Sequence, residues 1–84
     1  MSAFYYLELI EAKKNDNIVR WFYEGKDYFS KEGVDGLIKG DDVIKELWDL
    51  INEGYIATVT SKEGKITKFT STKDLLIYCF QDIK

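Results

Sequence analysis

Histidine and proline are both absent from this chain of 84 residues, and cysteine occurs once, at position 79. Without histidine the sequence cannot form a Ser-His-Asp or Cys-His catalytic arrangement, or an imidazole metal site. One cysteine forms neither an internal disulfide nor a metal site built from several thiolates. Cys79 lies in an apolar segment, so we expect a buried, unreactive thiol. We therefore predict a protein that is not an enzyme and that holds no metal and no cofactor.

Long apolar runs and a strong excess of one charge are also lacking. The longest apolar run, Leu75–Phe80, is far shorter than the 18 or more residues of a membrane-spanning helix. The first residues carry no basic region and reach Glu8 and Glu11 too early for a secretory signal, so we predict a cytoplasmic location and no membrane association. The net charge is only −3, and Arg20 is the sole arginine among twelve basic residues. This lysine bias is typical of an AT-rich genome, such as that of a low-GC bacterium or its phage.

The composition that remains fits one small globular domain spanning residues 1–84. Hydrophobic residues make up 45% and charged residues 32% of the chain, which are ordinary values for a folded protein. Alternating apolar residues predict strands over Phe4–Ala12 and Ile18–Tyr23, joined by the polar turn Lys13–Asn17. A helix is the alternative for the first of these segments. Together the two strands predict a β-hairpin.

The clearest helical pattern follows Gly40. Asp41 is the expected N-cap, and Gly54 is placed to end the helix in the left-handed conformation. Between them, apolar residues recur at helical spacing, and Trp48 is expected in the core beside Leu47. For residues 28–40 we predict a short helix ending at Gly40, because Val34, Leu37 and Ile38 also have helical spacing.

The last third of the chain predicts a second hairpin and a final helix. Strands are expected over Tyr55–Thr60 and Lys65–Thr70, around the turn Ser61–Gly64. Thr72 is the expected cap of a C-terminal helix, for which a strand is the alternative. The sequence therefore predicts an α+β fold: a small antiparallel sheet from two β-hairpins, with the central amphipathic helix and the C-terminal helix packed on one face.

Acidic residues form the most distinctive pattern. Asp42, Glu46, Asp49 and Glu53 follow the steps i, i+4, i+7 and i+11 of the central helix. At 100° per residue they lie within about 60° of arc, opposite the apolar face. Like charges at this spacing weaken a helix slightly, so either lysines elsewhere in the fold offset them or they bind a basic partner. We name these four residues the acidic stripe.

Aromatic residues are more numerous than a small core requires. The chain has two Trp, six Tyr and five Phe, and each ring buries about 150–250 Å² when it is enclosed. A sheet with helices on one side leaves its other face open, so some rings of the first hairpin should lie on an exposed surface. We expect a partner, or a second copy of the chain, to cover at least one face of this hairpin, which carries either Tyr5, Trp21 and Tyr23 or Phe4, Tyr6 and Phe22. The candidate contact residues are Tyr6, Trp21 and Tyr23.

Lysines gather at the predicted second hairpin, at positions 62, 65 and 68. A helix ending in Asn52-Glu53-Gly54-Tyr55-Ile56 and followed by a lysine-bearing hairpin resembles the closing elements of winged-helix DNA-binding domains. That resemblance implies a nucleic-acid-binding regulator. The preceding helix presents acids, however, where a recognition helix needs Arg, Lys, Asn or Gln.

These patterns favour a non-catalytic protein-binding module. It would be a small inhibitor or adaptor that docks on a basic host protein, including one that binds nucleic acid, through the acidic stripe and exposed aromatic residues. The alternatives are the winged-helix-like regulator, in which nucleic acid is bound directly, and a structural subunit that forms homo-oligomers such as a homodimer.

Overall fold

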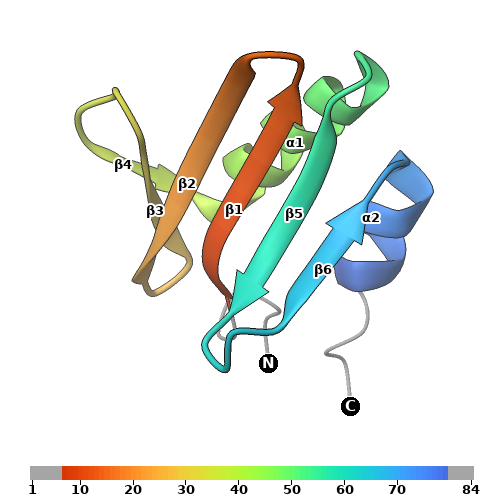
Figure 1. Ribbon diagram of the computed structural model, residues 1–84. Coiled ribbons are helices and arrows are strands. Elements are labelled where there is room, and N and C mark those ends of the chain that lie inside the picture. Colours follow the sequence, from red (N-terminus) through yellow and green to blue (C-terminus); the bar gives the residue numbers. More distant parts are fainter. Residues whose placement is uncertain (1–6, 80–84) are drawn as a thin grey trace.

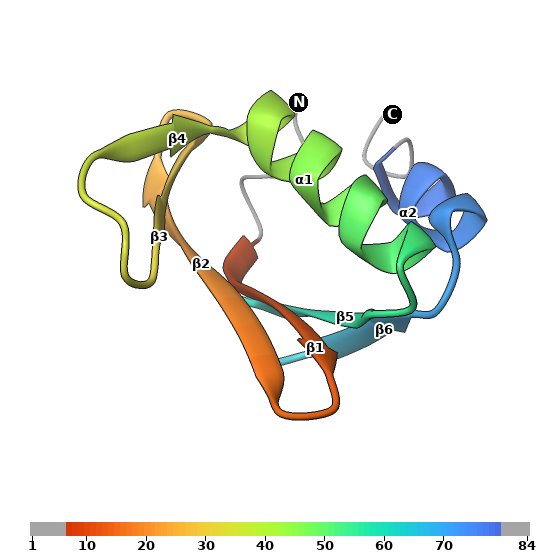
Figure 2. The same ribbon diagram turned by 90° about the horizontal axis from the view of Figure 1, so that it is seen from above.

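The chain forms an antiparallel sheet of six strands with two helices on one face, as Figures 1 and 2 show. The computed structural model describes the backbone of residues 7–79 and the side chains of residues 7–78. The predicted fold class is confirmed. The elements in chain order are β1 (Leu7–Lys14), β2 (Asn17–Gly25), β3 (Tyr28–Lys31), β4 (Leu37–Lys39), α1 (Gly40–Asn52), β5 (Ile56–Ser61), β6 (Ile66–Phe69) and α2 (Thr72–Cys79).

The sheet order is β4-β3-β2-β1-β5-β6, so the first hairpin occupies the centre and the second extends one side. The short helix expected over residues 28–40 is wrong, because β3 and β4 fill this segment. Gly33 and Gly36 in the connection adopt φ of 83° and 88°, which favours a turn between strands over a helix. The strands then complete the ladder of β2, with Phe29 paired to both Tyr23 and Ile38.

One face of the sheet forms the core with α1 and α2. Strand residues on this covered face are buried, and they meet a row of apolar residues from α1. Leu7 joins them because β1 has a bulge between Leu7 and Leu9, which separates two residues that regular alternation would place on one face. The buried core residues are Leu7, Ile10, Ala12, Trp21, Phe29, Val43, Leu47, Ile51, Ala57, Val59, Phe69 and Leu75.

Neither of the helices formed by the described residues lies on the opposite face of the sheet (Figure 2), and we call it the open face. Strand pairing identifies its residues, because cross-strand partners lie on the same side of a sheet. Leu9 pairs with Phe22 and Thr60, and Glu11 pairs with Arg20 and Thr58. All of these side chains therefore belong to the open face.

The start of each helix differs from the sequence-based prediction, whereas the end of α1 agrees with it. The N-cap of α1 is Lys39, without a side-chain cap, and Asp41 lies in the first turn. Ser71, and not Thr72, caps α2, since its Oγ accepts a hydrogen bond of 3.3 Å from the Asp74 N–H. Asp41 and Asp74 still lie in the first turns of α1 and α2, where a carboxylate interacts favourably with the positive end of the helix dipole.

Gly54 ends α1 as predicted, in a left-handed conformation with φ of 100°. The Gly54 N–H donates to the Ile51 carbonyl and the Tyr55 N–H to the Leu50 carbonyl, both at 3.0 Å, which is the Schellman pattern. Lys14 adds a third contact, donating from Nζ to the Glu53 carbonyl at 2.7 Å. This ammonium stabilises the negative end of the helix dipole.

The Schellman glycine provides a direct test of this helix end. Gly54→Ala should lower the free energy of unfolding by about 1–2 kcal/mol, because an L-residue adopts positive φ at that cost. The added Cβ would meet Lys14 only at ordinary contact distance, 3.7 Å, so the cost comes from the backbone. Urea titration measures it. Asn52→Ala, at an exposed helical residue two positions before Gly54, is the control. It should change the free energy of unfolding by less than about 0.5 kcal/mol. An equal effect of the two substitutions would contradict the Schellman motif.

Candidate functional site

The acidic stripe follows the side of α1 that faces away from the sheet, and its last member, Glu53, is the C-cap residue of the helix. Asp42, Asp49 and Glu53 are exposed, while Val43, Leu47 and Ile51 on the opposite side are buried. None of these three acids forms an ion pair with any residue in the described part of the chain. Their carboxylates are therefore available to a partner.

Glu46 differs from the other three acids of the stripe because it has a partner within the fold. Lys31, from β3, donates to the Glu46 carboxylate across the gap between sheet and helix. The same ammonium lies 5.8 Å from the centroid of the Trp21 ring, within the range of a cation–π contact. Glu46 thus ties α1 to the sheet, and the surface charge of the stripe comes mainly from the other three acids.

The aromatic residues predicted to bind a partner are placed differently. Trp21 has an exposed fraction of 0% and lies in the core, so its expected place on an exposed surface is wrong. Tyr23 is half-buried on the same covered face, where it meets the Phe29 ring edge-on at 5.2 Å between centroids. Tyr6 lies outside the described residues, as does the side chain of Cys79. The face of β2 that carries Trp21 and Tyr23 is the one that α1 covers.

Trp48, the second tryptophan, is the one that reaches the surface of the protein. Trp48 is half-buried on α1, which corrects its predicted place within the core. Together with Ile44, Lys45 and Asp49 it lines a shallow depression of about 340 Å³ on the outer side of the helix. An indole that is part-buried and part-exposed is the type of side chain that most often anchors protein–protein contacts. The helical spacing of Trp48, at the edge of the apolar arc, was the sequence signal for this position.

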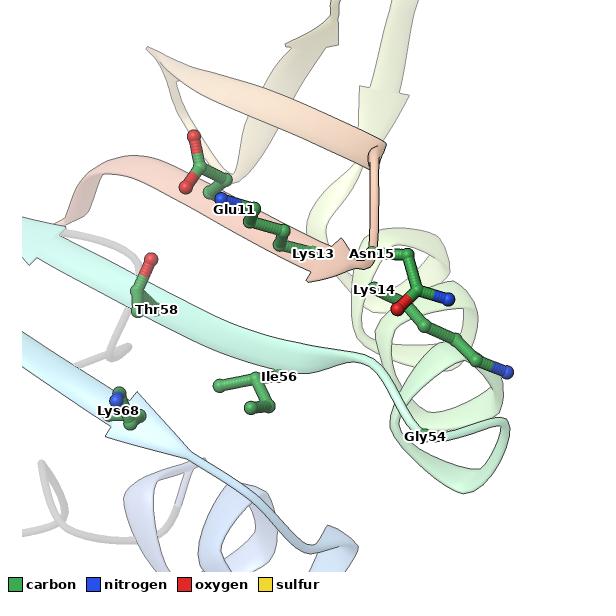
Figure 3. Close-up of a pocket in the computed structure, with 8 residues that line it drawn as sticks. All are labelled: Glu11, Lys13, Lys14, Asn15, Gly54, Ile56, Thr58 and Lys68. Carbon is green, nitrogen blue, oxygen red and sulfur yellow. The ribbon is translucent and has the colours of Figure 1, made fainter.

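A depression of about 680 Å³ lies on the open face near the turn between β1 and β2 (Figure 3). Glu11, Lys13, Ile56, Thr58 and Lys68 line it from the sheet, and Lys14, Asn15 and Gly54 complete it at the end of α1. Lys13 and Lys68 form no ion pair within the described residues. The wall thus combines ammonium groups, one carboxylate, an amide, a hydroxyl and an isoleucine side chain.

Glu11, the only carboxylate of this depression, is held by Arg20. The Arg20 Nε donates to the Glu11 Oε2 at 2.7 Å, and its Nη1 donates to the Glu32 Oε1 at 3.1 Å. These hydrogen bonds, that to Glu11 first, raise the pKa of the Arg20 guanidinium above its usual range. The charge-assisted hydrogen bond from Arg20 therefore fixes the position of the Glu11 carboxylate on the open face.

The arrangement of side chains can bind charged or apolar surfaces. Among residues 7–78, no group of three or more His, Cys, Asp or Glu side chains is placed to hold a metal ion. Neither helix in the described part of the chain has the length and apolar character needed to cross a membrane. Two surfaces are distinctive. One is the outer side of α1, which carries exposed acids and Trp48, and the other is the open face, which carries exposed apolar side chains.

No protein-family model matches the chain, and comparisons with curated proteins and with solved structures likewise found no significant match.

Proposed function

We propose that this chain is a non-catalytic protein-binding module that docks on a basic surface of a protein partner through α1. The observation that carries the proposal is a row of three exposed carboxylates without an ion-pair partner among the described residues, one of which, Asp49, lines a depression together with the half-buried Trp48. Complementary charge speeds and orients association, and an indole supplies most of the contact energy once the two surfaces meet. The outer side of α1 combines both requirements.

The charge of this surface indicates the chemistry of the partner. Asp42, Asp49 and Glu53 lie along three turns of one side of the helix, about 16 Å from the first to the last at 1.5 Å per residue. A row of carboxylates of this length suits a row of lysine and arginine side chains. Proteins present such rows where they bind the phosphates of nucleic acid. An inhibitor or adaptor of a nucleic-acid-binding protein is therefore the form of the proposal that the charge pattern supports best.

Affinity capture with a matched pair of charge variants tests this function. In the first variant Asp42, Asp49 and Glu53 become lysine, and Glu46 is kept because it holds Lys31. In the second, Asp16, Asp35 and Glu63, three exposed acids outside α1, become lysine. Each set of changes moves the net charge from −3 to +3.

Wild type and the second variant should capture the same basic protein from extracts of the encoding organism, and the first variant should not. Mass spectrometry identifies the captured protein, and circular dichroism confirms that each variant is folded. Equal capture by both variants would exclude the outer side of α1. Binding of the wild type to a labelled DNA duplex, with affinity falling steeply as salt rises, would instead favour direct recognition of nucleic acid through the hairpin lysines.

A further inference from the structure

Exposed apolar side chains are concentrated on the open face of the sheet. Nine large apolar residues in the described part of the chain are exposed, and six of them lie on this face. Isolated apolar residues on a surface are ordinary, but a group on one helix-free sheet face marks an interaction surface. The six are Ile18, Phe22, Tyr28, Leu37, Ile56 and Ile66.

The central cross-strand row of this face is symmetric in chemistry. In sheet order it contains Leu37, Ser30, Phe22, Leu9, Thr60 and Ile66, each paired with the next. Read from either edge, the row is apolar, hydroxyl, apolar, and its midpoint falls between β2 and β1, which is also the midline of the sheet. A twofold contact requires one patch to be complementary to itself, and this row meets that condition.

We infer that the open face binds a second copy of this chain, with the twofold axis parallel to the strands along the line between β2 and β1. Phe22 of each copy then packs on Leu9 of the other, and Ser30 lies opposite Thr60. In the next row, Arg20 lies opposite Glu11 of the other copy, because these residues pair across the same midline. The charges of this row therefore alternate across the contact, and in the row beyond it the Lys13 side chain lies over Ile18 of the other copy.

The edges of the sheet argue for face-to-face contact over edge-to-edge pairing. The edge strands are β4, with three residues, and β6, with four, and each carries an exposed lysine, Lys39 and Lys68. Short strands that bear lysine are a common protection against pairing with another sheet. In Figure 2 the β3–β4 side of the sheet also bends toward α1, so β2, β1 and β5 present the most prominent part of the open face.

The size of the face sets the expected strength of the dimer. Six strands about 4.8 Å apart and about five residues deep span at most roughly 500 Å² of planar area per copy, and the short edge strands and the bend of the β3–β4 side reduce it, so the contact lies at the weak end of specific interfaces. A dissociation constant of about 1–100 µM is therefore expected. Because each copy carries a net charge of −3, added salt should strengthen this contact by screening repulsion, whereas it weakens docking through the acidic stripe.

Sedimentation velocity of the purified chain from about 5 µM to 1 mM tests the inference. Wild type should change from monomer to dimer within this range, and the dimer should persist in 0.5 M salt, where screening is nearly complete. Phe22→Glu should raise the dissociation constant at least about 100-fold, since each dimer loses two central contacts. Leu76→Glu on α2 is the matched control, with an exposed fraction of 44% against 40% for Phe22 and the same charge change. It should leave the dissociation constant within about threefold.

A mixing experiment tests the register of the dimer. Phe22→Lys alone and Leu9→Glu alone should each be monomeric, because the new charge faces an apolar residue in both halves of the contact. Mixed together, they should form a heterodimer in which Lys meets Glu in one half and Leu9 meets Phe22 in the other. Thermal melts of each variant confirm folding. A wild type that stays monomeric at 1 mM would overturn the inference, as would a dimer insensitive to Phe22→Glu or a mixture that fails to associate.

Discussion

Replacing Trp21 with alanine is expected to lower the free energy of unfolding by about 3–5 kcal/mol, which is the range for deleting a fully buried large ring. Trp21 is completely enclosed between the sheet and α1, and Ile10 is its neighbour on β1. Its Nε1 has no hydrogen-bond acceptor in the described part of the chain, so the loss is one of packing. Since a domain of this size has about 5 kcal/mol or little more to lose, much of the variant should be unfolded at 37 °C.

Trp48→Ala is the matched comparison, because it removes the same ring from a half-buried site on α1. It should cost less than half as much as Trp21→Ala, since part of the indole surface is already in contact with water. Each variant also leaves a single tryptophan as a fluorescent reporter. Acrylamide should leave the native emission of Trp21 in the Trp48→Ala variant nearly unchanged, and it should quench part of the wild-type emission, to which the half-buried Trp48 contributes. A larger loss of stability for Trp48→Ala would contradict the assignment of the core.

The layout of strands and helices could be predicted wherever one periodicity dominates the sequence. On α1, apolar residues at helical spacing and a glycine at the C-terminal end agree with each other, and both are found in the structure. The helix predicted for residues 28–40 is wrong because Val34, Leu37 and Ile38 fit helical spacing only by coincidence. Leu37 and Ile38 lie in β4, which pairs with β3, and β3 in turn pairs with β2, whereas Val34 lies in the connection between β3 and β4. These pairings decide the conformation of the segment, and helical spacing does not encode them.

The candidate site could be predicted only in part, for a related reason. The four acids of the stripe follow from helical geometry alone, and three of them are exposed as that geometry requires. The partner of Glu46 could not be found in the same way, because Lys31 approaches from β3. β2 has apolar residues on both faces, so its pattern does not say which face a helix will cover. For that reason Trp21 was assigned to the surface, while Phe22 occupies it.

Reversing the three exposed acids of α1 should slow association with the captured partner by about 10- to 100-fold at low salt, since long-range attraction acts mainly on the encounter. The variant in which Asp16, Asp35 and Glu63 become lysine carries the same net charge, so it controls for the overall field. Its association rate should fall by less than about threefold if the local row of carboxylates guides the encounter. Rates from surface plasmon resonance at several salt concentrations measure both effects.

Trp48 should act on the other rate constant. Trp48→Ala removes an anchor and no charge, so the association rate should stay within about twofold while dissociation quickens by about 30-fold or more, as for a contact residue worth at least 2 kcal/mol. The salt dependence of association should disappear in the acid-reversal variant and persist in Trp48→Ala. Variants must first be shown to be folded, because lysine at position 42 opposes the helix dipole. If Trp48→Ala changed only the association rate, or if both charge variants slowed association equally, α1 would guide no specific encounter and the open face would remain as the surface for partners.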